Sequence, residues 1–154
     1  TGVNWASCIY NNFGEDLLKK IAGQDFVVHI ISASALLDMI INGEYAASPT
    51  IFNSHVYESK NKGAPVAWLP LEPVRVSLGQ IALARNAPHP HAALLFADFE
   101  LSKESAEIHR GVGYDNFRKD IPALEQHYKK YLGQDTVENV KKDIDIFNRL
   151  FVNK

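Results

Sequence analysis

The spacing of apolar residues changes along the chain between a helical period and the short runs typical of buried strands. Residues 4–22 have apolar positions on one helical face, are interrupted around Gly14 and end at Gly23, which predicts a broken helix or two short helices. Residues 26–31 form a short apolar run rich in β-branched side chains, a pattern typical of a strand buried on both faces. The chain is therefore predicted to begin with helical structure followed by a buried strand.

The same order of strand and helix recurs in the next part of the chain. Ser32 begins a predicted helix with apolar residues on one face, and the Asn-Gly pair at residues 42–43 is expected to end it in a left-handed turn. Residues 46–52 predict a second strand, and residues 56–62 predict a second helix, which Gly63 ends.

A third strand is predicted at residues 66–69. Strands that alternate with helices in units this short imply right-handed crossovers and a mainly parallel sheet. Helices would then cover both faces of that sheet. The sequence therefore predicts an α/β protein with a three-layer α/β/α arrangement and additional C-terminal helices.

The pattern changes in the second half of the chain. Between residues 70 and 84, prolines and alternating apolar positions predict a long extended connection. Residues 92–101 predict a helix that starts near Pro90, and residues 102–104 begin another helix that runs toward Gly111.

Two further helices are predicted to close the chain. The last begins at Asp135, which is followed three residues later by Glu138 in a capping-box-like start. Its apolar positions are expected to line one face, which packs against the rest of the protein. These positions are Val137, Val140, Ile144, Phe147 and Phe151.

Composition excludes several classes of function. The 154 residues are 46% hydrophobic, which is enough for one compact domain with a core of its own. The formal net charge of -2 is spread evenly, so no basic stripe is present for a nucleic acid backbone. No apolar run approaches the roughly 18 residues that a membrane span requires. The single cysteine, Cys8, cannot form an internal disulfide and is predicted to be a small buried side chain.

His89, His91 and Asp98 have the residue types of a metal site, and a metal-dependent hydrolase that uses them is one functional alternative. Their spacing argues against it, because positions two apart on a helix point to different sides when Pro90 is the first helical residue. Asp98 and Glu100 diverge in the same way, by about 200 degrees, and so do not form a catalytic carboxylate pair. Packing and capping at the helix start are the favoured interpretation.

Two polar corners follow predicted strands. Ser32 and Ser34 lie where the first strand passes into a helix, and Asn53 and His55 occupy the equivalent place after the second strand. Free N–H groups and the helix dipole favour an anion at such helix starts. Ligands of open α/β sheets bind outside the carboxyl ends of the strands, so the two corners are expected to face one cleft. The alternative is that Ser32 and Asn53, or Ser54, only cap their helices.

The chain resembles the extracellular, or periplasmic, solute-binding proteins of ABC transporters, in the family 1 or iron(III)-type group with the type II periplasmic-binding fold. The resemblance rests on residues 42–45 (NGEY), residues 62–68 (KGAPVAW), residues 71–73 (LEP) and residues 87–104 (APHPHAALLFADFELSKE). These segments occur in the family's order over most of the chain. The chain resembles the carboxy-terminal portion of such a protein.

In such proteins two α/β lobes close over a small solute and extended crossovers act as the hinge. The resemblance implies that residues 1–73 form the α/β core of the second lobe and that residues 74–86 form a hinge crossover. It places residues 87–118 as helices that belong with a mostly missing first lobe. Residues 119–154 are expected to be helices that return to the second lobe. We therefore expect further chain to supply the first lobe.

The same resemblance implies ligand contacts at Thr1 and Gly2, at the corner from Ser32 to Ser34, at Asn53 with His55, and at Glu72. Iron-binding members of the family use two adjacent tyrosines, whereas the six tyrosines of this chain are all separated in the sequence. This difference disfavours ferric ion and favours an organic or phosphorylated solute. No catalytic residue and no cofactor are predicted.

The leading hypothesis is a substrate-binding component of an ABC importer. It would capture a small solute in an interlobe cleft and deliver it to the membrane permease, in the periplasm and without enzymatic activity. The chain begins at Thr1 with no export signal before its first helix, so such a signal is expected to have been removed or to lie outside the chain. Besides the hydrolase, the remaining alternative is a non-catalytic interaction domain that dimerises through surface left exposed by the missing lobe.

Overall fold

The computed structural model describes residues 2–122, 124, 128–133 and 136–153. Most of the described chain is helical, and the two strands form a single short parallel pair. In chain order the elements are α1 (Gly2–Phe13), α2 (Glu15–Ala22), α3 (Ala33–Ile41), α4 (Asn53–Asn61), β1 (Val74–Arg75), α5 (Pro90–Glu100), α6 (Lys103–Gly111), β2 (Lys130–Tyr131), α7 (Val137–Phe147) and the π-helix η1 (Asn148–Val152).

The N-terminal segment forms two helices separated at Gly14, as the sequence predicted. Gly14 has a φ of 85 degrees, in the left-handed region where a glycine carries no Cβ penalty, and its N–H donates to the Tyr10 carbonyl at 2.9 Å. Gly23 then ends α2, and its N–H donates to the Lys19 carbonyl at 2.9 Å. The break lets α2 fold back against α1.

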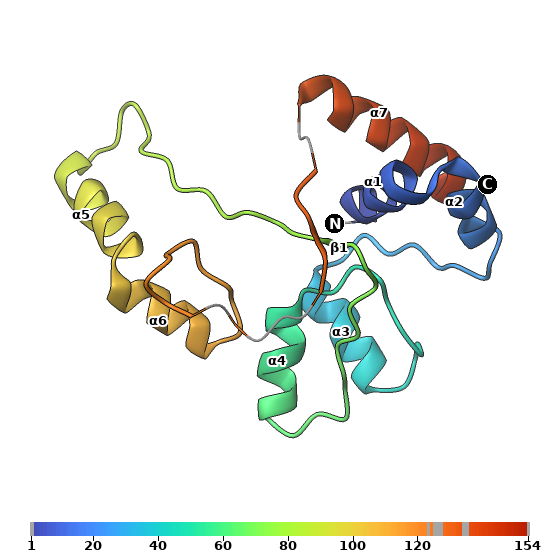
Figure 1. The fold of residues 1–154 in the computed structure, drawn as a ribbon, viewed down its shortest axis with the longest axis horizontal. Helices are drawn as coiled ribbons and strands as arrows, with labels where there is room; N and C mark the ends of the chain where they lie inside the picture. The colour runs from blue at the N-terminus through green and yellow to red at the C-terminus, as the bar shows by residue number, and fades with distance from the viewer. Residues whose placement is uncertain (1, 123, 125–127, 134–135, 154) are drawn as a thin grey trace.

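The hydrophobic core lies where α1 and α2 meet the C-terminal helix α7 and η1 (Figure 1). Leu18 is completely buried at its centre, with Ile146 and Phe151 from the C-terminal end of the chain. Aromatic rings surround this cluster, and the centroids of Trp5 and Phe26 each lie within 6.1 Å of another ring of the group. The two ends of the chain therefore share one core.

The helices α3 and α4 pack against each other and run in the same direction, so that both N-terminal ends lie toward β1 (Figure 1). Gly43 follows α3 with a φ of 79 degrees, which confirms the predicted left-handed turn. Gly63 ends α4 in the same way, with a φ of 90 degrees.

The predicted strands at residues 26–31, 46–52 and 66–69 are wrong as elements of this structure. Among the residues that the structure describes, the paired strands are β1 and β2, in which Val74 aligns with Lys130 and Arg75 with Tyr131. An extended segment becomes a strand only when a neighbouring strand accepts and donates its backbone hydrogen bonds. Within the described ranges these runs have no such neighbour, and Ile30 projects fully into solvent.

The predicted extended connection is present. After β1 the chain runs without a helix until α5, and Figure 1 shows this segment leading to α5 and α6, which lie end to end at an angle, away from the N-terminal helices. Pro90 is the first residue of α5, and Ser102 begins α6 by accepting a hydrogen bond from the Ser105 N–H at 3.1 Å, both as predicted.

The C-terminal part departs from its prediction in two respects. The first of the two predicted closing helices is absent from the residues described between α6 and α7, so that prediction is wrong for them. These residues, 112–122, 124 and 128–133, contain β2 and no helix. Thr136 caps α7 by accepting from the Asn139 N–H at 3.2 Å, while the predicted start, Asp135, lies outside the described residues. Only part of the predicted face is buried, because Val137 points into solvent. The fold is thus mixed and rich in helix.

Candidate functional site

The first predicted corner is the N-terminal end of α3. Ser32 occupies the N-cap with extended backbone, and its hydroxyl oxygen accepts a hydrogen bond from the Ala35 N–H at 3.1 Å. The hydroxyl of Ser34 lies 3.1 Å from that of Ser32, and both side chains are exposed. The capping role of Ser32 is confirmed. Ser34 supplies a second hydroxyl that does not cap the helix.

The second corner, at the N-terminal end of α4, differs from its prediction. The N-cap is Phe52, which has no side-chain capping bond, and Asn53 is the first helical residue, so neither Asn53 nor Ser54 caps the helix. Ser54 is instead buried. The His55 ring meets the Phe52 ring edge-on at 5.6 Å. The Nδ1 atom of His55 is buried, with no hydrogen-bond partner among the residues that are described.

The two corners lie at the same end of the α3–α4 pair (Figure 1). The first N–H groups of a helix have no acceptor within the helix, and its dipole makes this end electropositive. Within the described part of the chain, no hydrogen bond or ion pair joins Ser32 or Ser34 to Asn53 or His55. The shared end therefore offers two hydroxyls, an imidazole and two sets of N–H donors, a chemistry suited to an anion.

A Ser32→Ala substitution separates capping from any other role of this corner. We expect it to lower the free energy of unfolding by about 1 kcal/mol, because the Ala35 N–H loses its acceptor. Ser34→Ala is the matched control and should leave stability within about 0.5 kcal/mol of the parent. Urea denaturation followed by circular dichroism measures both changes. Equal losses would show that the hydroxyl pair, and not the cap, stabilises the helix start.

The remaining predicted ligand residues occupy other places. Glu72 is exposed and precedes Pro73, whose carbonyl accepts a hydrogen bond from the Cys8 thiol at 3.2 Å. Gly2 begins α1, and a Cβ there would lie 3.0 Å from the Phe147 ring, so its small size is explained by packing against α7. Thr1 lies outside the described residues. Neither Gly2 nor Glu72 is connected by a hydrogen bond to the α3–α4 corners within the region that is described.

Cys8, whose thiol contacts Pro73, is buried, as predicted. Burial raises the pKa of the Cys8 thiol, and the nearby Arg75 charge offsets this shift only in part. The thiol is therefore held in its protonated form, in which it donates to the Pro73 carbonyl. A buried protonated thiol is a poor nucleophile, so Cys8 has a structural role.

His89, His91 and Asp98 are all exposed on or beside α5. His89 holds the N-cap position but makes no capping hydrogen bond with its side chain, so the predicted capping role is wrong for this residue. No three histidine, cysteine, aspartate or glutamate side chains come together as a metal site in the described ranges.

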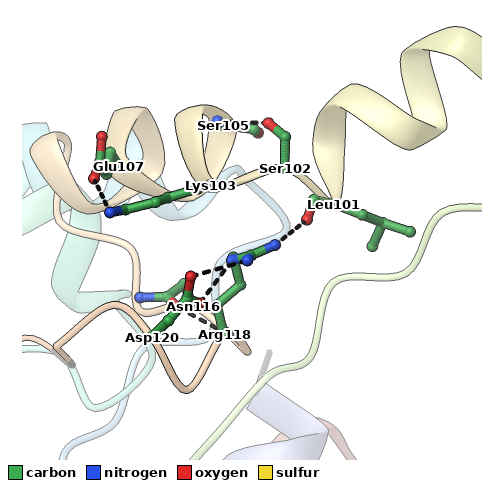
Figure 2. Close-up of polar contacts among 8 residues, drawn as sticks. All are labelled: Leu101, Ser102, Lys103, Ser105, Glu107, Asn116, Arg118 and Asp120. Carbon is green, nitrogen blue, oxygen red and sulfur yellow. Dashed lines mark hydrogen bonds and ion pairs between the residues drawn. The ribbon is translucent and has the colours of Figure 1, made fainter.

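A polar cluster at the junction of α5 and α6 was missed by the sequence analysis (Figure 2). The Arg118 guanidinium donates to the Leu101 carbonyl at 2.9 Å, where α5 ends, and to both carboxylate oxygens of Asp120 at 2.8 and 3.0 Å. The hydrogen bonds from Arg118 hold the pKa of the Asp120 carboxyl below its usual value. The short spacing of Arg118 and Asp120 could have been noticed, but the carbonyl partner is distant in sequence.

Glu100 anchors a second group at the same junction. Its Oε2 atom accepts from the Ser105 hydroxyl at 3.4 Å and lies 3.0 Å from Nε2 of His109. The serine and the histidine thus share one carboxylate and do not contact each other through their polar atoms. His109 is not placed to take the Ser105 proton, so this trio does not form a nucleophilic triad.

No protein-family model, curated protein or solved structure matches the chain. None of the helices in the described part of the chain is long and apolar enough to cross a membrane. Two surface hollows lie away from the α3–α4 corners. One lies along α7 and η1 beside Lys142, Asp145, Ile146 and Arg149, and another lies beside Tyr57, Glu107, Arg110, Gly111 and Leu124.

Proposed function

We propose that this chain is part of the substrate-binding component of an ABC importer and that it binds a small anionic solute at the N-terminal ends of α3 and α4. The common direction of these two helices is the observation that carries the proposal. Two dipole ends and two sets of free N–H donors converge on one side of the α3–α4 pair. The segments at residues 42–45, 62–68, 71–73 and 87–104, which resemble the family of solute-binding proteins, support the same function.

The proposal assigns roles to three side chains. Ser34 would donate its hydroxyl to the solute, since its side chain is exposed and takes no part in capping the helix. His55 would donate through Nε2 of its imidazole, because Nδ1 is buried and has no partner among the described residues. No proton or group transfer is required of them, so the proposed activity is capture and release.

We also propose the wider arrangement that the family resemblance suggests. The predicted strands at residues 26–31, 46–52 and 66–69 would belong to a three-layer α/β/α lobe and would pair with strands contributed by further chain. Residues 74–86 would then be the hinge between two lobes, and the solute would pass from the interlobe cleft to a membrane permease outside the cytoplasm.

A thermal-shift comparison of glucose 6-phosphate with glucose tests the preference for an anion. A ligand that binds only the folded state and is present at one hundred times its dissociation constant adds about 2.7 kcal/mol of stability. We expect the phosphorylated sugar to raise the melting temperature and the neutral sugar to raise it less. A wider panel of sugar phosphates, polyamines and ferric citrate covers the other solute classes.

Variants test whether an increase in melting temperature arises from binding at the proposed site. Ser34→Ala and His55→Ala should reduce the stabilisation by the phosphorylated solute, whereas Asn11→Ala, on the exposed side of α1, should not. The proposal is contradicted if no solute stabilises the parent chain. It is also contradicted if the Ser34→Ala and His55→Ala variants respond as the parent does.

A further inference from the structure

Helix α5 is apolar around most of its circumference and yet contains no buried residue. Leu94, Leu95, Phe96 and Phe99 all point into solvent, and Leu95 is 71% exposed. Among the described elements, α5 contacts chiefly α6, which follows it after two residues. A helix that is hydrophobic on all sides is ordinarily buried, so this helix has the character of one half of an interface.

The most exposed side of α5 carries an ordered stripe. The partly covered positions are Ala93, Ala97 and Glu100, which lie together on one side of the helix. The opposite side holds His91, Leu95 and Asp98, which follow the i, i+4, i+7 spacing of one helical face. The stripe therefore has an imidazole at its N-terminal end, leucine at its centre and a carboxylate toward its C-terminal end.

We propose that α5 docks in antiparallel fashion against α5 of a second copy of this chain, with the two-fold axis passing near Leu95. In a two-fold interface each residue that contacts a partner residue is contacted by it in return. His91 lies four residues before Leu95 and Asp98 three residues after it, so the antiparallel arrangement sets each His91 opposite the partner's Asp98. The leucines and the flanking Leu94 and Phe99 side chains form the apolar centre.

Charge complementarity selects a second copy as the occupant. The imidazole N–H of His91 donates to a carboxylate, and two such pairs form, one on each side of the axis. The antiparallel arrangement also places the positive end of one helix dipole beside the negative end of the other. A uniformly basic or uniformly acidic partner would pair with only one end of the stripe. The inference goes beyond the proposed function and does not depend on any solute.

Light scattering after size-exclusion chromatography, over a range of protein concentrations, tests the docking. The parent chain should show twice the mass of one chain at high concentration. Leu95→Glu should raise the dissociation constant about tenfold or more, because it places a charge at the apolar centre. Ile30→Glu is the matched control, since Ile30 is 101% exposed and lies outside α5. Both positions are on the surface, so circular dichroism should show that both variants remain folded.

A charge exchange tests the antiparallel register. His91→Glu sets two carboxylates against each other in its own dimer, and Asp98→Lys sets cations against the imidazoles, so each variant alone should dimerise more weakly. An equimolar mixture should regain the dimer, because each contact then pairs opposite charges. A parent chain that stays monomeric overturns the proposal, as does a Leu95→Glu variant that dimerises normally. A mixture that dimerises no better than its components overturns the antiparallel register.

Discussion

Replacing Leu18 with alanine is expected to lower the free energy of unfolding by about 2–5 kcal/mol. Leu18 is 0% exposed and lies between the N-terminal helices and the C-terminal residues Ile146 and Phe151. Truncation removes apolar area from the interior and leaves a cavity that the surrounding rings fill only in part. The small size of the buried cluster makes this a large share of the total stability, which for a single domain is about 5–15 kcal/mol.

Leu17→Ala provides the matched control for this prediction. Leu17 is the neighbouring residue of α2 and has the same chemistry, but it is 38% exposed. Its truncation should cost clearly less than that of Leu18, since part of the side chain already contacts water. Chemical denaturation of the two variants under the same conditions gives the comparison. Equal losses in the free energy of unfolding would show that the side of α2 that carries Leu18 does not pack into the core.

Gly113→Ala is expected to lower the free energy of unfolding by about 2–5 kcal/mol. Gly113 has a φ of 88 degrees, and a side chain in this left-handed conformation costs about 1–2 kcal/mol. The new Cβ would also lie 2.8 Å from the Cβ of Tyr57 on α4. This contact joins the segment after α6 to α4, and relieving it requires the backbone to shift, at a further cost of about 1–3 kcal/mol.

Gly63→Ala isolates the conformational part of this effect. Gly63 has nearly the same φ, 90 degrees, but no atom lies within 4 Å of the position of a new Cβ. It should therefore show only the backbone cost of about 1–2 kcal/mol. The difference between the two variants measures the contact with Tyr57. If both alanine variants lost the same stability in thermal or urea denaturation, the close approach of Tyr57 would have no energetic consequence.

The local signals in the sequence predicted the helices well. Gly14 and Gly63 ended helices where a positive φ was needed, and Ser32 and Ser102 capped helices whose first N–H groups required an acceptor. Such signals act between residues that are close in the sequence. They could be interpreted without knowledge of the tertiary structure.

The strand predictions failed because strands depend on partners. Val27 and Ile30 belong to a run with strong strand propensity, but propensity does not supply a neighbouring strand, and both side chains are exposed. The short pair that does form, β1 with β2, brings together Val74 and Lys130, which are far apart in the sequence. No local pattern indicated Lys130 as part of a strand.

Only the part of the candidate site that depends on local signals was predicted. Ser32 was assigned correctly because capping is local, whereas Asn53 was assigned as a cap although the helix begins one residue earlier, after Phe52. Asparagine is favoured at a cap, but Ser54 and Val56 are buried and Asn53 lies inside the helix. Arg118 was missed because its acceptor, the Leu101 carbonyl, lies 17 residues away in the sequence.

The core that joins the two ends of the chain has a consequence for synthesis on the ribosome. Leu18 and Trp5 leave the ribosome well before Ile146 and Phe151, against which their cluster packs. At about 5–20 residues per second, the apolar faces of α1 and α2 wait on the order of ten seconds for these partners. The nascent helices α1 and α2 therefore present an apolar surface that a chaperone can bind until α7 and η1 have emerged and completed the core.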